Sequence, residues 1–357
     1  MGATVSIVLR VSVIAALAAV LACVPACGKK DGAGKAKIGV VTNCTDEFWD
    51  ICDAGARKAA AEFNVDLLFR QPEQAFDAKA QMEIVESWAK QGLDGIVVSV
   101  INPKGQTEDL TRIAQKTPLV TMDNDADKTG RKCYVGVDNY EAGKAVGRIV
   151  KKTLPQGGTV AMFIGDTKSA NAQARTQGVL DELAGEKDAK GADGTHPQKP
   201  DLDVRTYGKY HLVDRAPKED GGPDNAQKTA GAVLARVKGL SDLCMVGLYA
   251  YNPPAILNEA KARSMTKEIK IVGFDEKWDT LRGIEAGEIE ATVVQDPFAY
   301  GYESVKALAT KNFDVKPIPY RVVTKDGKPD PALGGEAVEA AKFQADLRAK
   351  IGAAQKK

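Results

Sequence analysis

Side chains suited to hydrogen bonding and ring stacking recur just after the apolar segments of this sequence. The first such segment, "KIGVV", is followed by "TNCTDEFW", which ends in the adjacent rings Phe48 and Trp49. Planar amide, carboxylate and guanidinium groups can each bond to two neighbouring hydroxyls, and aromatic faces suit the apolar C–H faces of a small cyclic polyol. Both chemistries together are typical of a site for a small polyhydroxylated ligand. The candidate ligand-binding residues are Phe48, Trp49, Asp123, Asn124, Arg175, Asn252, Asp275 and Gln295.

Each of these candidates also has a purely structural interpretation. Phe48 and Trp49 could be the apolar start of a helix that packs on a sheet. Asp275, after "VGF", is a preferred helix cap, and Asn252 precedes two prolines that suit the first turn of a helix. A lone arginine such as Arg175 is most often a solvated helix charge. The residue types alone leave both interpretations open.

Short apolar segments alternate with Ala-rich segments of helical spacing along most of the chain. The alternation runs from "KAKIGVV" at residues 35–41 to "IPYRVVT" at residues 318–324. Apolar strands separated by helices indicate parallel sheets covered on both faces. About ten strands exceed what one compact sheet of this kind holds, so we predict an α/β fold with two Rossmann-like lobes. Open parallel sheets bind ligands beyond the carboxyl ends of their strands, where the candidate residues stand.

Two segments depart from this alternation. Residues 186–201, "EKDAKGADGTHPQKPD", are polar and lie inside one strand–helix repeat, so we expect a surface insertion there. The end of the chain, "GGEAVEAAKFQADLRAKIGAAQKK", has helical spacing and a basic finish. It predicts an amphipathic helix that either packs on a lobe surface or stands in solvent.

The first 27 residues have the pattern of an export signal. A short polar start with Arg10 leads into an apolar run that ends in "VPAC", and this run is short for a transmembrane anchor. Small residues before a cysteine resemble a bacterial lipobox, so Cys27 is the predicted lipidated residue and Cys23, in "VLAC", is the alternative. Residues 28–35 would form a flexible tether. We therefore expect an exported, periplasmic lipoprotein that is held at the membrane by lipid alone.

The charge balance and the cysteines exclude several other kinds of site. Lys plus Arg total 49 and Asp plus Glu total 48, and a net charge of +1 argues against a nucleic-acid partner. Beyond the lipobox there is no C-x-x-C pair with metal spacing, so neither a metal nor a cofactor is expected. The remaining cysteines, Cys44, Cys52, Cys133 and Cys244, are either buried small side chains or include a Cys44–Cys52 disulfide.

No sequence motif indicates catalysis. The chain contains no G-x-S-x-G elbow, no H-E-x-x-H and no phosphate loop that ends in Lys-Ser or Lys-Thr. Asp123 and Asp275 could be cast as the carboxylate pair of an exported glycoside hydrolase. A receptor also uses carboxylates as hydroxyl acceptors, so we expect binding without an enzymatic activity.

Several blocks of this sequence resemble periplasmic ribose-type sugar-binding proteins, the solute receptors of ABC importers. The longest block is "IVGFDEKWDTLRGIEAGEIEATVVQDPFAYGYESV", and "VTN..DEFW", "TMDNDA", "YVGVDNYEAGKAVG" and "ARTQGVLDEL" stand before it in the family's order. The resemblance covers about residues 37–324. It implies the type I periplasmic binding protein fold, in which a three-strand hinge joins two discontinuous lobes. These would be residues 36–137 with 296–322, and residues 138–295, followed by a C-terminal extension at 323–357.

The resemblance also implies roles for the candidate residues. Phe48 and Trp49 would sandwich a sugar, and Arg175 would donate a fork of hydrogen bonds. The hydroxyl contacts would be completed by Asp123, Asn252, Asp275 and Gln295. Asn124 stands where ribose receptors usually carry arginine, which argues against ribose itself as the ligand.

The function implied by the resemblance is that of a monomeric receptor that captures a monosaccharide by hinge closure. It would pass the ligand to a membrane complex of a permease and an ATPase. The same fold also serves receptors that report to a chemoreceptor or sensor kinase, and the sequence leaves import and signalling open. Sugar-responsive transcription regulators share this core as well, but they begin with a helix-turn-helix, whereas this chain begins with an export signal.

Overall fold

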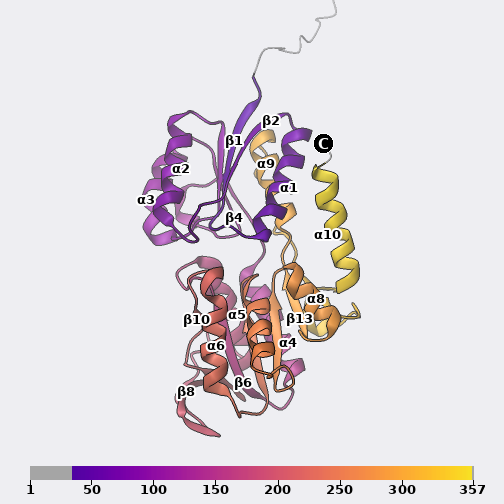
Figure 1. Ribbon diagram of the computed structural model, residues 1–357. Coiled ribbons are helices and arrows are strands. Elements are labelled where there is room, and N and C mark those ends of the chain that lie inside the picture. The colour runs from indigo at the N-terminus through magenta and orange to yellow at the C-terminus, as the bar shows by residue number, and fades with distance from the viewer. Residues whose placement is uncertain (1–33, 356–357) are drawn as a thin grey trace, which may run out of the picture. The chain divides into compact units, whose positions relative to one another are not determined.

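Two β-sheets with helices on their faces organise the molecule (Figure 1). The computed structural model describes residues 34–355, so the predicted signal peptide and the lipidation candidates Cys23 and Cys27 lie outside the described residues. Lys35–Lys357 forms one compact unit. Within the described residues, no helix is long and apolar enough to cross a membrane.

The first sheet has five parallel strands in the order β2-β1-β3-β4-β5. They are β1 (Ala36–Val41), β2 (Val65–Arg70), β3 (Gly95–Val98), β4 (Leu119–Met122) and β5 (Cys133–Val135), which follows the short turn η1 (Asp127–Thr129). Strands β3 and β4 are buried throughout, as expected for apolar strands with helices on both faces. One face carries α2 (Ala78–Lys90) and α3 (Pro103–Ala114), and the other carries α1 (Glu47–Glu62) and α9 (Pro297–Thr310) (Figure 1).

The second sheet is mixed, in the order β15-β14-β13-β12-β11-β6-β9-β8-β7, with β10 paired to β6 off this path. Its parallel centre consists of β6 (Gly158–Ile164), β11 (Leu243–Gly247), β12 (Ile269–Phe274) and β13 (Ala291–Val294). The edge elements are β7 (Ala192–His196), β8 (Lys199–Tyr207), β9 (Tyr210–Val213), β10 (Lys218–Glu219), β14 (Arg321–Thr324) and β15 (Glu336–Glu339). The accompanying helices are α4 (Asn139–Thr153), α5 (Ala170–Ala184), α6 (Pro223–Val237), α7 (Asn252–Ala262), α8 (Trp278–Ala286), the turn η2 (Pro331–Leu333) and α10 (Ala340–Gln355).

Close helix pairs hold the elements that carry the predicted site. Gly301 of α9 lies against the carbonyl of Cys52 in α1, and a Cβ at this glycine would collide with that carbonyl. Gly143 of α4 lies in the same way against the carbonyl of Arg175 in α5. Any larger residue at these two positions would force the helix pairs apart, so only glycine permits this spacing.

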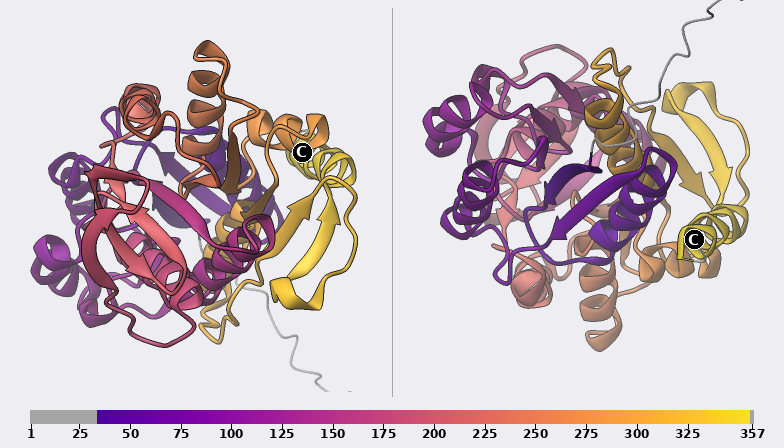
Figure 2. Two further views of the ribbon diagram at one scale, coloured as in Figure 1. Left: turned by 90° about the horizontal axis from the view of Figure 1, so that it is seen from below. Right: turned by 90° about the horizontal axis from the view of Figure 1, so that it is seen from above.

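The predicted α/β fold is confirmed, with a parallel first sheet and a mixed second sheet. The C-terminal segment differs from the single helix that was expected, because residues 336–339 form β15 and α10 begins at Ala340. Strand β14 offers an edge with unpaired backbone groups, and β15 pairs with it in parallel while Val338 packs on the core. Figure 2 shows this strand and α10, both in yellow, together on one side of the molecule.

The expected surface insertion at residues 186–201 contains β7 and the start of β8. The two strands pair antiparallel, for example Thr195 opposite Asp203, and most of β7 is exposed to solvent. The sequence around this hairpin has the pattern of helices and parallel strands, so a short antiparallel hairpin is difficult to recognise within it.

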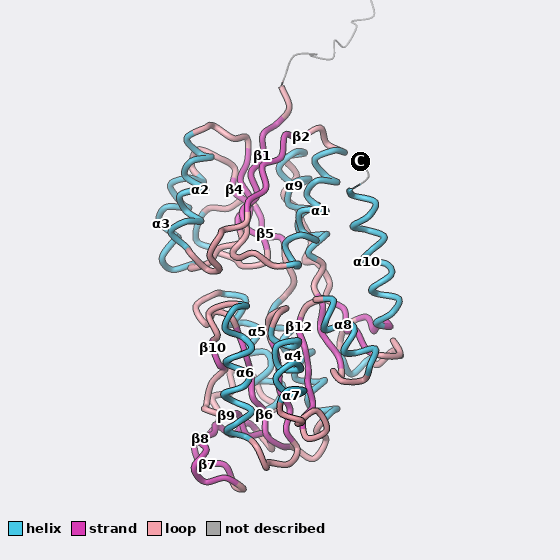
Figure 3. The backbone as a smooth tube through the Cα atoms, in the orientation of Figure 1, coloured by secondary structure: helices cyan, strands magenta, loops and turns pink. Residues whose placement is uncertain are grey.

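The predicted lobe boundaries remain a prediction. Helix α9 follows the expected crossing at Asp296, and its Gly301 packs on α1 beside the first sheet. Strand β14 pairs antiparallel with β13 in the second sheet, although the expected boundary at residue 322 falls inside it. The loops after the strands of the two sheets face one another, as the pink segments in Figure 3 show.

Candidate functional site

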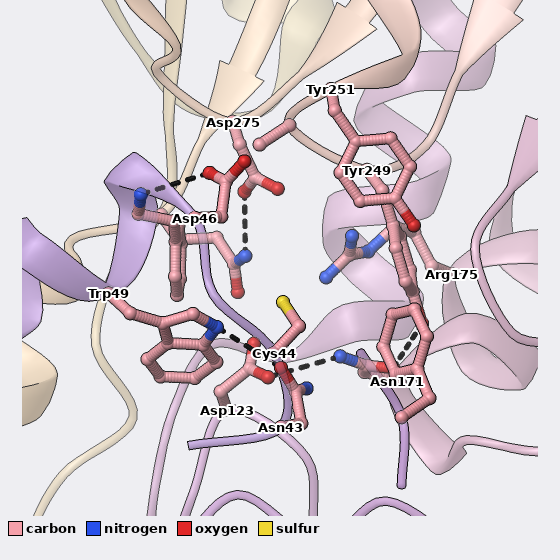
Figure 4. Close-up of a pocket in the computed structure, with 14 residues that line it drawn as sticks. Asn43, Cys44, Asp46, Trp49, Asp123, Asn171, Arg175, Tyr249, Tyr251 and Asp275 are labelled. Atoms are coloured by element: carbon pink, nitrogen blue, oxygen red, sulfur yellow. Dashed lines mark hydrogen bonds between the residues drawn. The ribbon is translucent and has the colours of Figure 1, made fainter. Parts of the chain in front are cut away.

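A cavity lies where the loops after the strands of both sheets meet (Figure 4). About 390 Å³ between its lining atoms is unfilled by protein, a volume that includes open solvent, and the centre of a water-sized sphere can occupy about 40 Å³ of it. Six of the predicted residues line it: Phe48, Trp49, Asp123, Arg175, Asp275 and Gln295. The other lining residues are Asn43, Cys44, Asp46, Phe76, Asn171, Tyr249, Ala250 and Tyr251.

The aromatic pair Phe48 and Trp49 stands in the first turn of α1. Asp46 is the N-cap of this helix, and its carboxylate accepts from the Phe48 amide at 3.1 Å. The two rings meet edge to face with their centroids 4.8 Å apart, and the Trp49 indole N–H donates to Asn43 Oδ1 at 3.1 Å. Both rings are buried in the core and also border the cavity. Packing therefore holds them in the position predicted for ligand contact.

A second aromatic group was missing from the predicted site. Tyr249 and Tyr251 follow β11, and the ring centroid of Tyr249 lies 6.0 Å from that of Tyr251 and 6.2 Å from that of Phe76. The two tyrosines share a sequence signal with the selected residues, since they stand just after an apolar strand. Phe76 has no such signal, because it lies in the loop before α2 and has a left-handed φ of 59°. The cavity thus has rings from both sheets.

Asp123 follows β4 and is held by uncharged donors. Its Oδ2 accepts from the Ser99 hydroxyl at 3.0 Å and from the Asn171 side-chain amide at 3.4 Å. Burial raises the pKa of Asp123 to about 6, against the opposing effects of Arg175 and of these hydrogen bonds. The carboxyl can therefore accept or donate near neutral pH.

A chain of hydrogen bonds orients Asp275 on the opposite side. Asp275 Oδ1 accepts from Gln295 Nε2 at 2.7 Å, and Gln295 Oε1 accepts from the Tyr300 hydroxyl at 2.7 Å. That hydroxyl in turn accepts from the Val137 amide at 3.1 Å. Burial raises the pKa of Asp275 to about 7, while the guanidinium of Arg175 opposes the shift. The chain fixes which end of the Gln295 amide faces the carboxyl.

Arg175 is a buried cation in the wall of the cavity and not a solvated helix charge. Only 1% of its surface is exposed, and its guanidinium carbon lies 3.6 Å from the centroid of the Phe274 ring. It donates to Asn139 Oδ1 at 2.8 and 3.2 Å and to the Leu248 carbonyl at 2.5 Å. Five N–H groups are present in a guanidinium, so donors remain for a ligand.

Asn124 and Asn252 do not line the cavity, and their ligand contact stays a prediction. The Asn124 side chain donates to the Val100 carbonyl and accepts from the Asn171 amide at 3.1 Å. Asn252 begins α7, accepts from the Tyr249 amide at 2.9 Å and donates to Asp220 at 2.7 Å. Both side chains therefore support lining residues from behind.

The structure distinguishes between the two alternatives for the cysteines, buried free thiols or a disulfide. All four cysteines of the described residues are unpaired and buried, so the possible Cys44–Cys52 disulfide is wrong. Cys52 lies with its Sγ 3.9 Å from Met122 Sδ. Cys44 instead borders the cavity, where Figure 4 shows its sulfur between Asp123 and Arg175, and burial raises the pKa of this thiol to about 12.

An ion pair joins the two sheets' loops beside the cavity. Lys277, before α8, places Nζ 2.9 Å from Asp46 Oδ2 and 3.6 Å from Glu47 Oε2 at the start of α1. Within residues 34–355, no group of three or more His, Cys, Asp or Glu side chains could hold a metal ion. The cavity is therefore lined by polar and aromatic side chains and is partly open to solvent.

Comparison with known proteins places this geometry in context. A family model described as a periplasmic binding protein domain matches residues 38–311. The D-allose-binding periplasmic protein of Escherichia coli K12 is 23% identical over 293 residues, which cover 78% of this chain and 85% of the relative. The ribose import binding protein of Bacillus subtilis 168 is 26% identical over 243 residues, covering 67% and 68%. An ABC transporter solute-binding protein from Burkholderia graminis, in complex with D-arabinose, has a TM-score of 0.71 at 23% identity and covers 83% of this chain and 97% of its own.

Proposed function

Because the chain belongs to the periplasmic binding protein family, we propose that it is the sugar receptor of an ABC importer. The ligand is a monosaccharide or a related small polyol, and it binds in the cavity where the loops of the two sheets meet. One observation carries this proposal: rings, carboxylates and a guanidinium from both sheets line a single space. The relatives named above are binding proteins, in agreement with the prediction of no enzymatic activity.

The lining residues match the two kinds of surface that a sugar presents. Phe48 and Trp49 offer ring faces and edges to C–H groups, while Asp123, Arg175 and Asp275 can bond to neighbouring hydroxyls. Relatives that bind allose, ribose and arabinose show the size of ligand that this fold accommodates. No catalytic base or nucleophile is required for capture.

Capture follows from closure of two hinged lobes. Contacts from both sheets exist together only when the lobes are closed, so a ligand that makes them shifts the open–closed equilibrium. A 100-fold shift needs about 2.7 kcal/mol of extra contact energy, and two hydrogen bonds to charged groups supply roughly 1.5–3 kcal/mol each. The lobes of this proposal are residues 36–137 with 296–322, and residues 138–295. A permease and ATPase complex would recognise the closed form of the monomer.

The protein is proposed to act outside the cytoplasm as a lipoprotein. The lipobox resemblance assigns the lipid to Cys27, with Cys23 as the alternative. Labelling cells with a clickable palmitate analogue tests this: Cys27→Ser should abolish the label, whereas Cys23→Ser should retain it. The reverse result would move the anchor to Cys23, and label in both variants would remove it from the lipobox.

A ligand panel tests the binding function directly. Thermal unfolding is measured with about fifty sugars and polyols, since a ligand that binds only the folded state raises the melting temperature. Any sugar that raises it should lose this effect in Phe48→Ala, because the ring borders the cavity. A panel without a single shift, for a folded protein, would contradict the proposed function.

A further inference from the structure

The cavity contains more buried carboxyl groups than cationic groups. Asp123 and Asp275 are 4% and 5% exposed, and neither forms an ion pair with any residue of the described chain within 4.0 Å. Arg175 faces both of them, but its guanidinium is bonded to Asn139 and Leu248. Apart from Asp46, which pairs with Lys277, the cavity therefore holds two carboxyls against one cation.

The neighbouring groups do not correct this imbalance. The ammonium of Lys277 is shared by Asp46 and Glu47. Burial raises the pKa values of the Cys44 thiol and of the Tyr249 and Tyr251 phenols above their usual range, so none of these groups is charged at neutral pH. No lining residue other than Arg175 is cationic.

One oxygen of each carboxyl is left for a ligand. Asp123 uses Oδ2 for Ser99 and Asn171, and Asp275 uses Oδ1 for Gln295. Figure 4 shows the two carboxyls on opposite sides of the same space. A buried carboxylate without a cation is costly, and pairing or protonation removes this cost.

We propose that the ligand carries a protonated amine on its polyhydroxylated frame, and that its ammonium binds against Asp123 and Asp275. This inference rests on the proposed function and narrows it to aminated sugars and polyols. A neutral sugar leaves a net charge in the closed cavity or requires a proton there. Because burial raises the pKa of Asp123 to about 6 and that of Asp275 to about 7, such a proton is held at acidic pH and is progressively lost as the pH rises through these values.

The two kinds of ligand differ in their response to pH. An ammonium prefers ionised carboxylates, so aminated sugars should bind more tightly as the pH rises from 5 to 7. A neutral sugar gains from protonated carboxyls, so its affinity should stay level or fall over the same interval. Opposite slopes within one matched pair are therefore the signature of the proposed charge pairing.

Calorimetry with matched pairs tests the inference on the full folded chain. The pairs are glucose with glucosamine, galactose with galactosamine, mannose with mannosamine, and 1,5-anhydroglucitol with 1-deoxynojirimycin. At pH 7 the aminated member of at least one pair should bind at least tenfold more tightly than its neutral partner. Asp275→Asn keeps an acceptor for Gln295 and should reduce that ratio to below about threefold, as expected when a charged partner is replaced by a neutral one.

Glu276→Gln is the matched control. It removes a buried carboxyl at the next position, and Glu276 does not line the cavity, so the ratio should be unchanged. Neutral members that bind as tightly as the aminated ones in every pair, or a ratio unaffected by Asp275→Asn, would overturn the inference while leaving sugar binding intact. A chain that binds no member of any pair and no sugar of the wider panel would overturn both the inference and the proposed function.

Discussion

The ligand cavity and the narrow gap behind the first turn of α1 each contain a buried carboxyl from the same loop, but in different surroundings. Asp275 borders the cavity with one oxygen bonded to Gln295 at 2.7 Å. Glu276, the next residue, is 2% exposed and lines the gap, and neither of its oxygens has a hydrogen-bond partner in the described chain. The gap leaves no room for a water molecule.

Asp275 can bond to the proposed ligand, whereas Glu276 adds a buried acid without a hydrogen-bond partner to the fold. On the cavity side, partly satisfied carboxyls retain an oxygen for an incoming donor. On the gap side, burial raises the pKa of Glu276 well above its usual range, and the charges of Asp275 and Asp296 add to the shift while Arg321 opposes it. Burial therefore disfavours the ionised form of Glu276, and neither of its carboxyl oxygens has a partner among the described residues.

The largest expected effect is on the cavity side of this comparison. Asp123→Ala removes a buried acceptor that lines the cavity and leaves Ser99 and Asn171 without their shared partner. Hydrogen bonds to charged groups contribute roughly 1.5–3 kcal/mol, so ligand affinity should fall about tenfold to a hundredfold. Calorimetry with a sugar identified in the panel measures this change. An affinity equal to that of the wild type would exclude Asp123 from the site.

On the gap side, a substitution should change the stability of the protein and leave its ligand affinity unchanged. Glu276→Gln removes a titration in which the folded pKa lies above the unfolded value of 4.5. Below that value the acid is protonated in both states, so the variant gains nothing. As the pH rises, Glu276 ionises more readily in the unfolded wild type than in the folded wild type. The wild type therefore loses stability, and the variant does not. The variant should therefore be more stable than the wild type at pH 7, by about 1.4 kcal/mol for each pH unit between 4.5 and the folded pKa, counted no further than pH 7.

Denaturant unfolding at pH 4 and pH 7 measures this difference, with Glu276→Met as a second variant. Methionine removes the unpartnered polar atoms as well as the charge, so it should be at least as stable as the glutamine variant at both values. A wild type more stable than both variants at pH 7 would show that Glu276 has a stabilising partner, and the contrast with Asp275 would disappear. Ligand affinity should be unchanged in both variants.

The sequence predicts the fold and six of the fourteen residues that line the cavity for a physical reason. Apolar strands alternating with helices leave few arrangements, and the carboxyl ends of parallel strands meet at one edge. Asp123 and Asp275 stand directly after β4 and β12, so the strands indicate their place, whereas Phe48 lies in the first turn of α1, after the loop that follows β1. A residue at the end of a strand can also cap or begin the next helix, as Asp46, the N-cap of α1 beside Phe48, shows.

The residues that sequence reasoning missed depend on contacts between distant segments. Phe76 reaches the cavity through a loop with left-handed backbone, and Asn171 reaches it through hydrogen bonds to Asp123 and Asn124. Glu276 gave no sequence signal either, because its burial depends on α1 packing over the loop before α8. The sequence of residues 336–339 predicts helix and not the strand β15, because that strand depends on pairing with the edge of β14, which is a tertiary contact.

A smaller effect on affinity is expected from a residue that does not border the cavity. Tyr300→Phe removes the hydroxyl that donates to Gln295 and accepts from the Val137 amide. Gln295 then loses the contact that orients its amide toward Asp275, so affinity should fall about threefold to tenfold, as for one buried hydrogen bond. Calorimetry measures the affinity, and thermal unfolding of the ligand-free protein measures stability. A lower melting temperature with an unchanged affinity would limit Tyr300 to a structural role.

The smallest effect concerns the ion pair between the two sides. Lys277→Met removes the cation that pairs with Asp46 and Glu47 but keeps most of the side chain's apolar stem. The Lys277 side chain is 19% exposed, and those of its partners Asp46 and Glu47 are 6% and 45% exposed. Lys277 itself does not line the cavity, so we expect its contribution to ligand affinity to be no larger than that of an exposed pair, about 0.2–1 kcal/mol. We therefore expect ligand affinity to fall about twofold to threefold at 50 mM salt, which corresponds to an energy within this range. Screening should abolish the difference between wild type and variant near 1 M salt, where the Debye length falls to about 3 Å.

A loss of the same size at both salt concentrations would assign the effect to packing over the gap, and the ion pair would then have no part in holding the two sides together.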